Sequence, residues 1–273
     1  SSDLLGSQAN AEGRIDAATQ SWSVLSGVAS EERAARSMAA LDAHLVQREH
    51  ALVRLLDPPF DGAGPDPGAV RAWPPGMGEN GGQSNEAAAW AAMAFARLGQ
   101  GERAWNLLDM INPLQRTRTC DDAQRYRLEP YVTAESISDA APHIGRAGGS
   151  WYTGSAGWMY RLIVESLLGI ECVSAHQRGR KTGQAGDQLV LAPQLPCGWP
   201  GFRMEYRYRS TVYQIEVRFA EAGALLVDGR EREGNVLDLA DDGQRHRVEL
   251  LVPRRHGPAM AAACEPIQSK SIT

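Results

Sequence analysis

The spacing of hydrophobic positions changes once along the chain, near residue 174. Before this point, apolar residues recur every three or four positions, which is the period of an α-helix. Gly27, Gly99 and Gly169 stand where helical stretches end, as glycine often does. The predicted helices cover residues 14–26, 31–48, 84–98, 102–111 and 155–168.

Local signals support this helical part. Ser30 precedes Glu31 and Glu32, so it can cap a helix whose first turn is acidic. The helices at 84–98 and 102–111 are joined by a very short link, which indicates an antiparallel hairpin. Prolines and glycines exclude a helix from residues 57–68.

After residue 174 apolar and polar residues alternate, which indicates strands separated by turns. Such a series favours an antiparallel β-sandwich. We therefore expect a helical domain over 1–173, a small β domain over 174–254 and a flexible tail over 255–273. The predicted strands cover residues 187–195, 202–209, 211–220, 223–229, 234–243 and 246–252.

Composition narrows the class of protein. The 273 residues are 43% hydrophobic and 22% charged, as in soluble globular proteins. A net charge of −5 argues against a nucleic-acid partner. The apolar runs are too short to span a bilayer, and no secretion signal stands at the start. We expect a cytoplasmic protein, or a cytoplasm-facing part of a larger membrane-bound synthase.

The cysteines and histidines suggest no metal centre. The four cysteines form no CxxC pair, and the histidines form no HxxxH or HExxH pattern. Scattered thiols in a chain of this size fit a reducing compartment. We expect neither a metal nor a cofactor.

The stretch GRAGGSWYTGSAGW, at 145–158, places glycines and aromatic residues just before a predicted helix. Glycine allows close approach of the backbone to a ligand, and a helix start attracts anions. Aromatic faces suit sugar rings. One interpretation is a site where an oxyanion and a sugar meet. The other is a tight loop whose tryptophans pack inside.

Four stretches occur in order: GENGGQSNEAAAW (78–90), YRLEPYV (126–132), GRAGGSWYTGSAGW (145–158) and PQLPCGWPGF (193–202). Together they resemble the glycoside hydrolase family 94 phosphorylases. This family includes cellobiose phosphorylases and the C-terminal phosphorylase region of cyclic β-1,2-glucan synthases, with which the resemblance is strongest. It implies a mainly α fold, the C-terminal half of an (α/α)6 barrel of the six-hairpin glycosidase type, followed by the β domain.

The resemblance also implies a reaction. Inorganic phosphate, as co-substrate, attacks a β-glucoside with inversion, and α-glucose 1-phosphate is released. No protein carboxylate is then needed as a base, because phosphate replaces the activated water. The implied phosphate-binding pair is Thr153 and Gly154. The implied sugar-binding residues are Glu79, Asn80, Gln20 and Trp151.

Other residues of these motifs have a structural interpretation as well. Trp22 and the pair Glu129 and Tyr131 fit supports inside the barrel. Arg146 and Arg161 fit surface or inter-helix salt bridges as well as phosphate contacts. His143 is a lone loop histidine, which is a weak indication of an oxyanion contact.

The chain also departs from the family pattern. The family's general acid is an aspartate in a WND-type motif that is absent here, and neither Asp3 nor Asp16 aligns with it. The resemblance therefore implies no catalytic acid within this chain. Glu86 stands where the family has a phosphate-contacting histidine, and its carboxylate would repel phosphate.

Three further departures remove side chains that the family pattern has in the site. Gly78 replaces a basic residue, Ser84 an aromatic residue and Gly149 a tryptophan of the family pattern. A half barrel also leaves apolar edges exposed. We therefore expect the N-terminal half of the barrel, or a second copy of the chain, as a partner.

Three hypotheses follow. The first is a phosphorylase or glucan synthase segment that acts on β-gluco-oligosaccharides together with its upstream half. The second is a catalytically inactive remnant that still binds carbohydrate. The third is a structural helical module without a ligand, which the retained glycine-rich stretch argues against.

Overall fold

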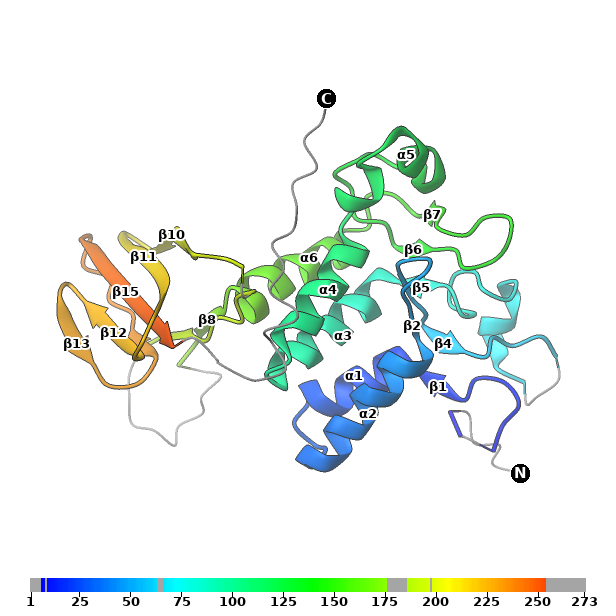
Figure 1. The fold of residues 1–273 in the computed structure, drawn as a ribbon, viewed down its shortest axis with the longest axis horizontal. Helices are drawn as coiled ribbons and strands as arrows, with labels where there is room; N and C mark the ends of the chain where they lie inside the picture. The colour runs from blue at the N-terminus through cyan, green and yellow to red at the C-terminus, as the bar shows by residue number, and fades with distance from the viewer. Residues whose placement is uncertain (1–5, 8, 63–65, 176–185, 197, 254–273) are drawn as a thin grey trace. The chain divides into compact units, whose positions relative to one another are not determined.

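The computed structural model describes residues 6–7, 9–62, 66–175, 186–196 and 198–253. The chain divides into two compact units, Ser1–Leu167 and Leu168–Thr273. Helices dominate the first and strands the second, which agrees with the mixed fold expected (Figure 1). The predicted tail over 255–273 lies outside the described residues.

The predicted helices are present in the first unit, with small shifts at their ends. An aspartate or serine side chain caps the first three: Asp16 accepts a hydrogen bond from the Thr19 N–H at 2.7 Å, and Ser30 and Ser84 act in the same way. The helices are α1 (Ala17–Leu25), α2 (Glu31–His44), α3 (Asn85–Arg97), α4 (Gly101–Ile111) and α6 (Thr153–Arg161).

Two helix ends differ from the prediction. Helix α2 stops at His44 rather than at residue 48, because β2 (Val46–Gln47) pairs with β3 (Leu52–Val53) and buries Val46. Helix α6 is α-helical only as far as Arg161 and continues as a π-helical segment, η3 (Leu162–Leu167). The apolar period predicts one continuous helix here and does not predict this change in hydrogen bonding.

The sequence pattern does not predict three short helical elements. Each is too short to show a full apolar stripe. They are η1 (Gly68–Ala72), η2 (Gln115–Thr117) and α5 (Cys120–Tyr126).

Helix α3 forms the centre of the first unit. Every alanine of this helix is buried, and α1, α4, α6 and η3 all contact it. Figure 1 shows α3 and α4 side by side within this group. Because a methyl group fills little space, neighbouring helices can approach on several sides at once.

Two-residue strands connect distant parts of the first unit. β1 (Ile15–Asp16) pairs with β4 (Leu56–Asp57). β6 (Ser136–Ile137) pairs with both β5 (Gln83–Ser84) and β7 (Ala147–Gly148), all antiparallel (Figure 1). This small sheet brings the start of α3 beside the glycine-rich stretch.

The second unit begins at Leu168 and contains two sheets. Its first strand, β8 (Ile170–Val173), precedes residue 174, where the alternating pattern becomes clear in the sequence. The three-stranded sheet has the order β14 (Val236–Asp238), β9 (Gln188–Leu191) and β8. The five-stranded sheet has the order β10 (Gly201–Tyr208), β11 (Thr211–Ala220), β15 (Arg245–Pro253), β12 (Ala224–Val227) and β13 (Arg230–Arg232).

The expectation of purely antiparallel strands is wrong at one place. β15 lies between β11 and β12 and runs parallel to β11, with Ile215 opposite Val248. Because β12, β13 and β14 separate β11 from β15 along the chain, β15 can run in the same direction as β11. Alternate residues of β11, including Ile215 and Val217, are buried, as the period of two predicts.

Candidate functional site

The glycine-rich stretch forms a strained loop between β7 and α6. Gly149 has φ +67° and Trp151 has φ +65°, a region that non-glycine residues rarely adopt. The Glu129 carboxylate holds this turn: it accepts hydrogen bonds from Ser150 Oγ at 2.9 Å and from Trp151 Nε1 at 3.1 Å. The backbone strain at Trp151 is thus compensated by contacts to a single carboxylate.

Trp151 is therefore held through its ring nitrogen and is otherwise largely exposed. The residue is 70% exposed, although its indole nitrogen donates a hydrogen bond to Glu129. Hydrogen bonds from the Glu129 main chain, Ser150 and Trp151 lower the pKa of Glu129. Glu129 is hence an anion at neutral pH and supports this loop through its bonds to Ser150 and Trp151.

The start of α6 offers backbone donors to solvent. Tyr152 occupies the N-cap position and makes no capping hydrogen bond with its side chain. Thr153 and Gly154, the next two residues, are both exposed. An uncapped first turn leaves N–H groups and the positive end of the helix dipole available to an anion.

Glu86 faces this helix start from the first turn of α3. A methyl group on Gly154 would overlap Glu86 Oε1, so the missing side chain at 154 leaves room for the carboxylate. Glu86 is half-buried. Among the described residues, its carboxylate makes no hydrogen bond and no ion pair. A carboxylate of the protein itself therefore lies at the uncapped turn.

Two buried polar residues fix the start of α3, and the motif comparison assigns them no role. Gln83 Oε1 accepts from the Val53 N–H at 2.8 Å, and its amide donates to Asn85 Oδ1 at 2.6 Å. Asn85 Nδ2 donates to the Ala134 carbonyl at 2.7 Å. Both side chains are fully buried and satisfied, so the backbone that carries Glu86 is held from two directions.

The segment around Glu79 and Asn80 divides into an exposed and a buried residue. Asn80 is 1% exposed; Oδ1 accepts from the Phe60 N–H at 2.7 Å, and Nδ2 donates to the carbonyls of Phe60 and Trp73, each at 2.9 Å. Asn80 thus uses its side chain to join two loops. Glu79 is exposed and free to face solvent.

The structure gives physical reasons for two of the departures from the family pattern. Gly78 has φ +48°, and a side chain there would overlap the Trp73 ring. Gly149 has φ +67°, and a side chain there would overlap Glu135 and crowd the Tyr152 ring. The local packing therefore leaves no space for the basic residue or the tryptophan that the family pattern has at these positions.

Three tryptophans form an edge-to-face cluster on α1, α3 and α6. The ring centroids of Trp22 and Trp90 are 5.5 Å apart, and those of Trp90 and Trp158 are 5.4 Å apart. Trp22 remains 41% exposed, and its neighbour Gln20 is half-buried. The cluster packs three helices together and leaves Trp22 partly exposed.

Other residues of the motifs lie apart from these contacts. Arg161 pairs with Glu165 at 2.7 Å and lies over the Trp158 ring, so the salt-bridge interpretation of Arg161 is confirmed. The remaining three are exposed loop residues: Tyr131, His143 and Arg146.

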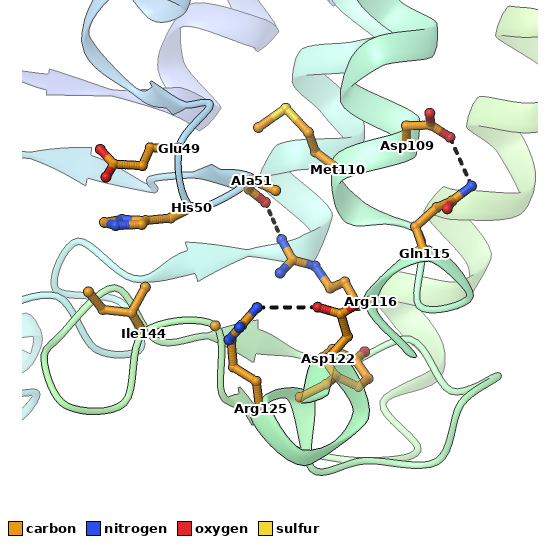
Figure 2. A pocket seen from close by; sticks show the side chains of 12 residues that line it. Glu49, His50, Ala51, Asp109, Met110, Gln115, Arg116, Asp122, Arg125 and Ile144 are labelled. Carbon is orange, nitrogen blue, oxygen red and sulfur yellow. Dashed lines mark hydrogen bonds and ion pairs between the residues drawn. The ribbon is translucent and has the colours of Figure 1, made fainter. Parts of the chain in front are cut away.

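A separate pocket of about 510 Å³ lies between η2, α5 and the turn after β2 (Figure 2). The guanidinium of Arg116 donates to the Ala51 carbonyl, and burial lowers the pKa of Arg116 to about 10. Figure 2 also shows Arg125 paired with Asp122, at 3.3 Å. Arg116 Nε has no hydrogen-bond partner within the described part of the chain. The pocket carries charges of both signs.

Two negative findings apply to the described residues. No group of three or more histidine, cysteine or acidic residues there has the geometry to hold a metal ion. None of the helices described is long and apolar enough to cross a bilayer.

Comparison with known proteins gives several related sequences. Cyclic beta-(1,2)-glucan synthase NdvB of Rhizobium meliloti (strain 1021) is 45% identical over 213 residues, which is 78% of this chain and 7% of that protein. N,N'-diacetylchitobiose phosphorylase of Vibrio proteolyticus is 32% identical, over 79% of this chain and 25% of that protein. Solabiose phosphorylase of Paenibacillus borealis is 29% identical, over 91% and 31%.

This chain therefore spans less than a third of the length of each of these relatives. Residues 1–169 match the model of the glycosyl hydrolase 94 superfamily, catalytic domain. That match contains the glycine-rich loop, the start of α6 and Glu86. The chain belongs to the glycosyl hydrolase 94 superfamily.

Proposed function

We propose that this chain is the C-terminal half of an (α/α)6 barrel, followed by a β-sandwich domain, and that the barrel acts on β-glucans. The reaction is inverting phosphorolysis of a β-glucoside to α-glucose 1-phosphate, as a phosphorylase or as part of a cyclic β-1,2-glucan synthase. The names of the related phosphorylases and of the glucan synthase support a carbohydrate role.

The observation that carries this proposal is the uncapped start of α6. Thr153 can donate its hydroxyl, and Gly154 its N–H, to phosphate oxygens in the first turn of a nine-residue helix. Both residues are exposed, so an anion can reach them.

The sugar lies, in this proposal, on the exposed faces around the same loop. Trp151 provides an open aromatic face, and Glu79 provides a carboxylate that accepts hydrogen bonds from hydroxyl groups. Gln20 contributes from α1. Asn80 acts by holding the loop beneath Glu79, because its side chain is already fully bonded.

The general acid lies in this proposal upstream of residue 1, in the half of the barrel that this chain lacks. A separate polypeptide or the preceding part of the same polypeptide supplies it. The chain alone is then inactive, since loss of a general acid lowers a rate by about 10²–10⁴-fold.

The second candidate is an inactive remnant that still binds carbohydrate, and the position of Glu86 favours it. Two unit charges about 4 Å apart repel by roughly 4 kcal/mol at an effective dielectric constant of about 20. Phosphate at Thr153 and Gly154 would meet this repulsion unless the Glu86 side chain moved away.

One assay tests both candidates. Short β-1,2- and β-1,4-gluco-oligosaccharides are incubated with inorganic phosphate and either this chain or a longer polypeptide that includes the upstream half. Release of glucose 1-phosphate only by the longer polypeptide supports the first candidate. Saturable oligosaccharide binding without release supports the second, and absence of both contradicts the proposal.

A further inference from the structure

The Glu86 carboxylate lies against Gly154 at the start of α6, and no hydrogen bond or ion pair holds it within the described residues. We propose that the site has a second reaction, hydrolysis of the β-glucoside, in which Glu86 activates a water molecule at the start of α6. This inference rests on the proposed function, because it uses the same sugar site and the same upstream acid.

The chemistry follows from what an inverting enzyme needs. An inverting hydrolase places a carboxylate on the side of the sugar opposite the general acid, where it deprotonates the attacking water. A phosphorylase needs no such carboxylate, because phosphate is already a nucleophile. A carboxylate beside the proposed phosphate-binding pair is therefore superfluous for phosphorolysis and suited to hydrolysis.

The geometry leaves Glu86 available for this role. Its Oε1 lies against Gly154, and within the described residues no side chain neutralises it or occupies its lone pairs. A surface carboxylate kept only for charge would be expected to face a cation or bulk solvent. Glu86 instead lies half-buried, facing a helix start that has no side-chain cap.

The backbone beneath Glu86 is also rigid. The hydrogen bonds of Gln83 and Asn85 tie the first turn of α3 to Val53 and to Ala134. A general base must be held within hydrogen-bond reach of its water, so a fixed backbone favours proton transfer. The Thr153 hydroxyl stands at the same helix start and can hold that water by a further hydrogen bond.

The proposed step conserves atoms, protons and charge. The water oxygen forms a bond to the anomeric carbon while the glycosidic C–O bond breaks. One water proton passes to Glu86, and the upstream acid gives its proton to the leaving oxygen. The products are α-glucose and the shortened oligosaccharide, with no redox change. Phosphate and the Glu86-bound water compete for the same place, so the two reactions exclude each other in any one turnover.

The test uses a polypeptide in which an upstream barrel half is joined to this chain, with β-1,2-gluco-oligosaccharides as substrates. Proton NMR follows α-glucose in phosphate-free buffer, and a coupled assay follows glucose 1-phosphate when phosphate is present. We expect Glu86→Gln to lower hydrolysis by about 100-fold or more, the usual contribution of a general base. We expect the same variant to release glucose 1-phosphate at least as fast as the unaltered protein, since a repelling charge is gone.

Two more variants test whether the effect of Glu86→Gln comes from lost chemistry or from a change in folding. Glu32→Gln removes a glutamate from the first turn of α2 and should leave both rates unchanged. Glu86→Ala with added azide should form α-glucosyl azide, because a small anionic nucleophile does not need the base. That product distinguishes a catalytic carboxylate from a structural one.

The outcomes separate this inference from the proposed function. Glucose 1-phosphate without phosphate-independent α-glucose would overturn the inference and leave phosphorolysis standing. Equal hydrolysis by Glu86→Gln and the unaltered protein would also overturn it. Absence of both products and of oligosaccharide binding would overturn the inference together with the proposed function.

Discussion

Replacement of Asn80 by alanine tests whether this residue holds a loop or contacts sugar. The side chain makes three hydrogen bonds, to the N–H and C=O of Phe60 and to the C=O of Trp73, and is 1% exposed. Leaving the buried N–H without a partner costs about 1–3 kcal/mol, and each carbonyl costs less because its second lone pair remains usable. We expect Asn80→Ala to lower the free energy of unfolding by about 3 kcal/mol.

Urea denaturation followed by circular dichroism measures this loss. In a unit of this size each kcal/mol lowers the melting temperature by about 2–4 °C, so we expect a fall of about 6–12 °C. Glu79→Ala, at the exposed neighbour, is the matched control and should change stability by less than about 0.5 kcal/mol. If Asn80→Ala keeps full stability but loses affinity for β-gluco-oligosaccharides, Asn80 contacts sugar and the loop-holding role is refuted.

Three other predictions concern single side chains. The carboxylates of Asp228 and Asp242, 2.7 and 3.0 Å from the ring nitrogens of His246, raise the pKa of His246, with Asp228 the larger cause. Protonated His246 therefore stabilises the fold fully below about pH 6.5, and this stabilisation is lost as pH rises through the raised pKa. His246→Gln should reduce the change in the urea midpoint between pH 6 and pH 8.5. An unaltered change in the midpoint would contradict this. Trp151→Phe removes one donor to Glu129, so the pKa of Glu129 should rise toward its usual range in a carbon-13 NMR titration, whereas Tyr131→Phe should leave it unchanged. Thr153→Ala should weaken phosphate binding by about 1–2 kcal/mol in calorimetry if its hydroxyl contacts the anion, and equal affinity would make Thr153 structural.

The sequence predicts the long helices and strands of this chain because each shows a clear period and a recognisable end. Ser30 caps α2 as expected, and the alternation in residues 211–220 marks β11. Two-residue strands carry no period, so the pairing of β5, β6 and β7 is invisible in the sequence. The parallel position of β15 is likewise a matter of chain order in three dimensions, which alternation does not encode.

The candidate site likewise contains residues that the sequence indicates and residues whose roles it does not indicate. The motifs lead to Thr153, Gly154 and Glu86, since each has a counterpart in the family pattern. They do not reveal that the Asn80 side chain is fully bonded, because an amide bonded to main-chain groups looks no different in sequence from one that faces a ligand. The roles of Gln83 and Asn85 depend on partners as far away as Val53 and Ala134, so spacing along the chain gives no sign of them.

The alanine-rich helix α3 has a mechanical consequence for the site at its start. Its thirteen residues form a rod of about 20 Å, with Glu86 near one end and Ala96 near the other. Long side chains absorb small displacements by changing rotamer, but methyl groups have no such freedom. A displacement of the C-terminal end of α3 therefore moves the whole helix, because its buried side chains cannot compensate by changing rotamer. Enlarging Ala96 should in this way change the distance between Glu86 and the start of α6, although Ala96 lies ten residues along the helix from Glu86.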